Sequence, residues 1–142
     1  MIDVTHFHPM LVHFPIALAM LGFFFEAIEL FFMRGKQQRN CGEFILYFAT
    51  LSAFAALLSG ELFTSEFVGK PLEVKELHAS FALISTILLS ISCVFYLVHR
   101  FLRKESKRIR TTGFIFYLLA TISISITGYM GGNLVYSYMI GL

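Results

Sequence analysis

Histidines are the residues in this sequence with the clearest capacity for chemistry. His8 and His13 lie at the start of the first apolar segment, and His78 opens the third. Imidazole binds transition metals and haem iron through a ring nitrogen. An unpaired polar ring inside a bilayer is costly, so each of these rings is expected to have a partner. Whether these rings lie close together depends on the secondary-structure elements that carry them.

Composition restricts those elements to membrane helices. Of the 142 residues, 57% are hydrophobic and 14% are charged, and 17 are Phe. In ordinary soluble domains roughly 45–50% of the residues are hydrophobic and about 25% are charged. This chain has too few polar residues to cover a soluble globule, and too much apolar surface to stay disordered. We therefore expect an integral membrane protein.

Four apolar segments divide the chain, near residues 9–33, 43–63, 76–101 and 112–139. Each is long enough for the roughly 20 residues that cross a bilayer as a helix. Four strands cannot close a barrel in lipid, so helix is the only suitable state. Short connections predict an all-α fold, a single up-down-up-down four-helix bundle over 1–142. Its first and third helices run parallel on a diagonal.

Basic residues predict the orientation of this bundle. Three of the 11 Lys and Arg residues lie within 34–42 and six lie within 100–111. Basic connections of this kind remain in the cytoplasm. A multi-pass membrane protein is therefore expected, with both termini and the residues around His8, His13 and His78 on the extracytoplasmic side. No nucleic-acid partner is expected, because apolar segments flank both basic runs.

Parallel diagonal helices would hold His13 and His78 at matched depth, about 11–14 Å apart. That gap suits a haem whose iron takes one imidazole from each side, so His13 and His78 are the predicted metal ligands, with His8 in reserve. Glycines near the same end would give a haem b room: Gly60, Gly128, Gly131 and Gly132. Polar residues there could bind its propionates or orient its ligands: Glu61, Asn133 and Tyr136.

Other interpretations of these residues stay open. His13 and His78 could bond to backbone or to Glu61 and only stabilise the bundle. His6, His8 and His13 could hold Zn or Cu, although His8 and His13 are five residues apart rather than four. A transporter would require oligomerisation, because four spans are few for a substrate path.

The remaining polar residues of the spans give little sign of chemistry. Glu26 and Glu29, near the first basic connection, are expected to form ion pairs rather than relay protons. Cys41 and Cys93 form no CxxC pattern and predict no disulfide framework.

Two segments resemble a known family. They are HPMLVHFPIAL (8–18) and GYMGGNLVY (128–136), with a single His opening the third span. Together they are similar to a bacterial family of small four-helix membrane proteins, domain-of-unknown-function family 2231. The resemblance covers essentially the whole chain and marks these positions: His8, Pro9, His13, Pro15, His78, Gly128, Gly131, Gly132, Leu134, Val135 and Tyr136.

The family is largely uncharacterised, so the resemblance implies architecture more than activity. Members sometimes accompany cytochromes or other redox proteins, which favours a haem. The chain departs from the pattern after Tyr136, where many members have a His–Gly pair and this sequence has Tyr138 and Met139. No ligand is expected from that end unless Met139 serves.

The expected function is therefore one-electron transfer, or redox or gas sensing, by a b-type haem near the outer membrane face. Such a chain is an electron carrier or subunit rather than a stand-alone enzyme. Its expected partners are the lipid bilayer, a membrane or extracytoplasmic redox protein and further copies of itself. The alternative is a non-catalytic structural or assembly subunit of a membrane complex.

Overall fold

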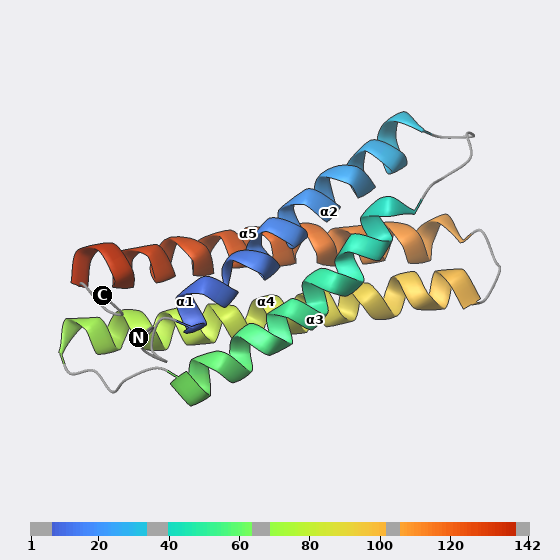
Figure 1. The fold of residues 1–142 in the computed structure, drawn as a ribbon. Coiled ribbons are helices and arrows are strands. Elements are labelled where there is room, and N and C mark those ends of the chain that lie inside the picture. The colour runs from blue at the N-terminus through green and yellow to red at the C-terminus, as the bar shows by residue number, and fades with distance from the viewer. Residues whose placement is uncertain (1–6, 34–39, 64–68, 102–105, 139–142) are drawn as a thin grey trace.

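The computed structural model describes residues 7–33, 40–63, 69–101 and 106–138, and these are helical almost throughout, with no strand among them. The helices are α1 (Phe7–Leu11), α2 (His13–Phe32), α3 (Cys41–Phe63), α4 (Lys70–Phe101) and α5 (Lys107–Tyr138) (Figure 1). Four spans, with α1 and α2 counted as one, are long and apolar enough to cross a membrane. The predicted all-α membrane class is confirmed. α4 and α5 begin earlier than their apolar segments.

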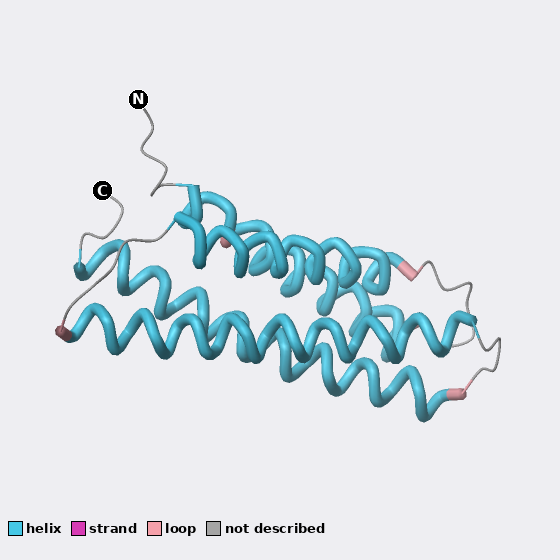
Figure 2. Tube along the Cα trace, turned by 90° about the horizontal axis from the view of Figure 1, so that it is seen from below, coloured by secondary structure: helices cyan, strands magenta, loops and turns pink. Residues whose placement is uncertain are grey.

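The bundle consists of two antiparallel helix pairs, α2 with α3 and α4 with α5 (Figures 1 and 2). α2 also packs against α5, and α3 against α4, which places α2 and α4 on a diagonal. The start of α1 and the end of α5 lie at the same end of the bundle (Figure 1). We call this the terminal end. The opposite end, where α2 finishes and α5 begins, is the basic end, and its cytoplasmic location stays a prediction.

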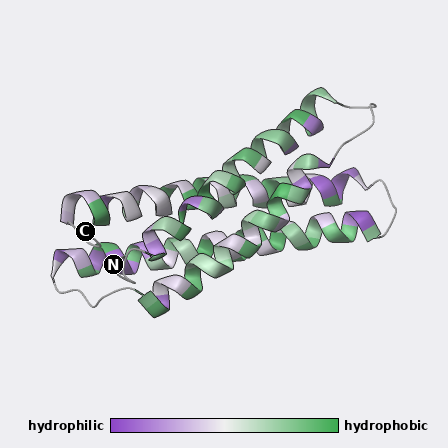
Figure 3. Ribbon diagram, viewed as in Figure 1, coloured by the Kyte–Doolittle hydropathy of each residue, from purple (hydrophilic) through white to green (hydrophobic). Residues whose placement is uncertain are grey.

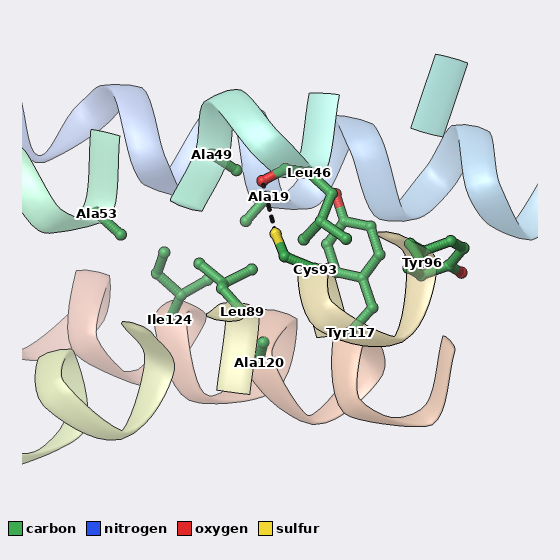
Figure 4. Close-up of a cluster of buried hydrophobic side chains, with 10 residues drawn as sticks. All are labelled: Ala19, Leu46, Ala49, Ala53, Leu89, Cys93, Tyr96, Tyr117, Ala120 and Ile124. Carbon is green, nitrogen blue, oxygen red and sulfur yellow. Dashed lines mark hydrogen bonds between the residues drawn. The ribbon is translucent and has the colours of Figure 1, made fainter. Parts of the chain in front are cut away.

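A core of small and aromatic side chains joins the two pairs between these ends. Leu46, Leu89 and Tyr117 are fully buried in it, and alanines from α2, α3 and α5 fill the remaining space (Figure 4). Outside this core the helices expose apolar side chains to the surroundings, and hydrophilic residues are concentrated toward the helix ends (Figure 3). This distribution suits a lipid environment.

Glycines set how closely the helices approach. A Cβ on Gly42 of α3 would lie 2.5 Å from the backbone nitrogen of Glu26 in α2. A Cβ on Gly22 would clash with the Tyr117 hydroxyl of α5 and with the Ile45 side chain of α3. A side chain at position 42 would have to move a helix, because it meets backbone, whereas one at position 22 would have to displace the side chains around it. The absence of side chains here permits the close packing that joins membrane helices.

A buried charge cluster closes the basic end. Arg110 of α5 donates from Nε (3.0 Å) and Nη2 (2.7 Å) to Glu26 Oε1 of α2. The Nη2 atom also lies 3.9 Å from Glu29 Oε2. Glu29 in turn accepts the backbone N–H groups of Asn40 and Cys41 at the start of α3, at 3.1 and 2.9 Å. The cluster therefore ties three helices together.

Sequence reasoning predicted ion pairs for both glutamates but associated them with the first basic connection. Among the described residues their partner is Arg110, from the second basic run, whereas Arg34 of the first connection lies outside the described residues. A second ion pair, Arg100 with Glu43 at 2.9 Å, joins α4 to α3 nearby, and its guanidinium lies over the Phe44 ring.

The two arginines offer a matched test of what burial does to an ion pair. The Arg110 side chain is 10% exposed and the Arg100 side chain 39%. Arg110→Leu strands a buried carboxylate, so we expect it to lower the free energy of unfolding by about 3–5 kcal/mol. Arg100→Leu should cost less, because Arg100 is more exposed and the buried Glu43 that it leaves keeps its hydrogen bond from the Tyr47 hydroxyl. Unfolding in detergent measures both, and equal losses would contradict the structural distinction.

Candidate functional site

His8 is held against α3 by its side chain. Its Nδ1 atom lies 2.7 Å from the hydroxyl oxygen of Ser59. Ser59 donates its own proton to the carbonyl of Ala56, at 2.8 Å. A hydroxyl has a single proton, so while Ser59 donates to Ala56 its oxygen can only accept from His8, which favours the Nδ1–H form of that ring. The neutral ring then carries its lone pair on Nε2.

His78 is held against α5 in a similar way. Its Nδ1 atom lies 3.0 Å from the backbone carbonyl oxygen of Thr127. A carbonyl can only accept, so Nδ1 carries the proton here as well. Metal-binding histidines usually donate their second ring N–H to a carbonyl or other acceptor. Both rings therefore have the hydrogen bonding of a metal ligand that would bind through Nε2.

The two rings are neighbours at the terminal end. Their centroids are 6.3 Å apart and their planes are at 88°. With metal–nitrogen bonds of about 2.0 Å and about 1.1 Å from nitrogen to ring centre, two imidazoles on opposite sides of one metal have centroids about 6 Å apart. The spacing also lies within the range of a direct edge-to-face contact.

Two glycines make room for these imidazoles. A Cβ on Gly60 would lie 3.2 Å from His8 Cε1, and a Cβ on Gly131 would lie 3.1 Å from His78 Cε1. Sequence reasoning assigned this room to a haem macrocycle, whereas in the structure imidazole rings lie against Gly60 and Gly131. A Cβ on Gly128 would instead meet Ile16, and one on Gly132 would meet no atom within 4 Å.

His13 points elsewhere. Its ring is exposed, and its Nδ1 atom donates to the carbonyl of Pro9, 2.8 Å away on the preceding helical turn. Five residues rotate a helix by about 140°, so His8 and His13 cannot both face the bundle. The structure gives the inward position to His8, and it is this ring, the predicted reserve ligand, that lies beside His78.

The other predicted site residues are less closely tied to the histidines. Tyr136 is 84% exposed and faces away from the bundle. Asn133 is half-buried, and Glu61 is exposed. Met139 and His6 lie outside the described residues, so the Met139 ligand and the His6–His8–His13 metal site stay predictions. Within 7–33, 40–63, 69–101 and 106–138, no group of three or more His, Cys, Asp or Glu residues could hold a metal ion.

Sequence reasoning missed both hydrogen-bond partners of the site. Ser59 could have been found in the sequence, since it is a polar residue inside the second apolar segment, directly before Gly60. Thr127 could not have been found in this way, because its backbone carbonyl and not its side chain accepts the bond from His78.

Gly131 and Gly132 provide a direct test of whether Gly131 makes room for the His78 ring. Gly131→Ala should displace the His78 ring and lower the free energy of unfolding by about 1–3 kcal/mol, the cost of overpacking. Gly132→Ala should leave stability unchanged or raise it by up to about 1 kcal/mol, because Ala favours helix and meets nothing there. Thermal unfolding in detergent compares the two variants. A Gly131→Ala protein as stable as wild type would contradict the close contact between Gly131 and the His78 ring.

Comparison with known proteins places the chain among membrane proteins. A search of curated proteins and a search of solved structures each gave no match. The family model described as a predicted membrane protein (DUF2231) matches residues 5–142. This match includes all four membrane spans and both histidine-bearing segments. The chain belongs to the DUF2231 family of membrane proteins.

Proposed function

We propose that this protein binds one haem b at its terminal end, with His8 and His78 as axial ligands, and transfers single electrons. The observation that carries the proposal is the paired geometry of the two imidazoles. Each donates Nδ1–H to a protein oxygen, and their centroids are 6.3 Å apart. Two neutral nitrogen donors from opposite sides are the ligand set of a six-coordinate haem iron.

A bound haem would supply one-electron chemistry. The chain's own part is to fix two imidazoles and exclude other ligands. With both axial positions taken by His8 and His78, no position would remain open for oxygen, which favours electron transfer over oxygen chemistry. Gly60 and Gly131 serve this purpose by letting the rings approach α3 and α5.

The basic end suggests where electrons would be exchanged. Its Lys and Arg residues favour a cytoplasmic location in the bacterial inner membrane, and His8 and His78 would then lie near the extracytoplasmic face. The redox partner would then be extracytoplasmic or a neighbouring membrane protein.

An absorption spectrum tests the haem directly. The protein, purified from haem-replete cells, should show the α-band of a six-coordinate haem b in reduced-minus-oxidised spectra. His8→Ala and His78→Ala should each abolish that band, because each removes an axial ligand. His13→Ala is the matched control and should retain it. A colourless preparation, or loss of the band only with His13→Ala and His78→Ala, would refute the His8–His78 site.

A second candidate is a non-catalytic subunit in which the histidines only fasten helices. The 88° angle between the rings favours it, since edge-to-face contact is a stable arrangement without any metal. Under this hypothesis a His8→Phe, His78→Phe variant retains aromatic packing and loses only two hydrogen bonds, about 1 kcal/mol each. Under the haem proposal the same variant loses the cofactor and its stabilisation. Thermal unfolding of haem-replete protein, followed at the α-band and by circular dichroism, separates the two.

A further inference from the structure

We infer that Ser59 is the positioning residue of His8, the side chain that determines which ring nitrogen is available to a metal. Ser59 is 3% exposed and belongs to α3, whereas His8 belongs to α1. The inference about the nitrogen stands on hydrogen bonding alone. Only its redox consequence rests on the proposed function.

Ser59 has a single hydroxyl proton to donate. That proton is directed at the Ala56 carbonyl, three residues earlier on the same helix, at 2.8 Å. The Ser59 oxygen therefore presents a lone pair to His8, whose Nδ1 lies 2.7 Å away. The opposite tautomer would place two lone pairs against each other unless Ser59 gave up its bond to Ala56. Ser59 thereby selects the Nδ1–H form.

The same hydrogen bond would influence a bound metal. An acceptor on Nδ1–H makes the imidazole a stronger donor through Nε2, and so favours the oxidised state of a coordinated iron. For His78 the corresponding acceptor is the backbone carbonyl of Thr127, which no substitution removes. Ser59 is thus a side chain through which the sequence can adjust the strength of this ligand pair.

Ser52 offers a matched control on the same helix. Its hydroxyl donates to the Ala49 carbonyl at 2.9 Å, the same three-residue spacing as Ser59 to Ala56. The described hydrogen bonds of Ser52 include no histidine. Ser52→Ala therefore reproduces the loss of a local hydroxyl, and Ser59→Thr restores the hydroxyl.

The first experiment needs no haem. Haem-free protein labelled with ¹⁵N-histidine is examined by NMR at a pH where the rings are neutral, with His8→Gln used to assign the His8 signals. Wild type, Ser52→Ala and Ser59→Thr should show His8 as the Nδ1–H form, and Ser59→Ala should show a mixture of tautomers. An unchanged Nδ1–H form in folded Ser59→Ala would overturn the inference.

The second experiment measures the midpoint potential of the haem-loaded variants. Ser59→Ala should raise the potential relative to wild type, whereas Ser52→Ala should not, and Ser59→Thr should return it toward the wild-type value. An unchanged or lowered potential in Ser59→Ala would refute the redox consequence. If wild type binds no haem, the proposed function fails, while the NMR result still decides the role of Ser59.

Discussion

A polar group in the bilayer interior has to find its hydrogen-bond partner within the protein, and the rest of this structure depends on that constraint. Most hydroxyls of the spans satisfy it locally, by donating to a carbonyl one turn back on their own helix, as Thr86 and Thr121 do. Such bonds stabilise a helix without saying which neighbour it packs against. The polar contacts between helices do specify the neighbour, so they contribute to the arrangement of the bundle.

Two groups of these contacts lie at opposite ends of the bundle, and hydroxyl contacts such as Ser85 with Ser123 join α4 to α5 between them. At the basic end, Arg110 and Glu26 join α5 to α2 by charge-assisted hydrogen bonds. At the terminal end, His8 and His78 join α1 to α3 and α4 to α5 by neutral ones. The apolar core lies between the two groups (Figure 4). The first group uses ionised residues that satisfy one another, whereas the second leaves a ring nitrogen with its lone pair on each histidine. The histidines are therefore the better candidates for binding a metal or a cofactor.

Much of the fold could be predicted from the sequence, because hydropathy and helix length are properties of local segments. Which of His8 and His13 faces the bundle could not be predicted. Both lie at or just before the start of α2, and only the rotation of the helix about its axis decides which ring points inward. Gly60 and Gly131 were identified as small residues, but their neighbours depend on how α1 and α4 pack, which no local pattern records. The pairing of Arg110 with Glu26 likewise joins residues 84 positions apart.

The separation in sequence of the site's components has a consequence for biogenesis. His8 bonds to a residue 51 positions later, and His78 to one 49 positions later. The ribosome therefore releases the last partner, in α5, long after the first histidine has left the tunnel. His8 and His78 therefore have both of their hydrogen-bond partners only once α5 is in place. A group that needs both rings in this hydrogen-bonded form would enter the finished bundle, from the lipid or through the terminal end, rather than be enclosed during synthesis.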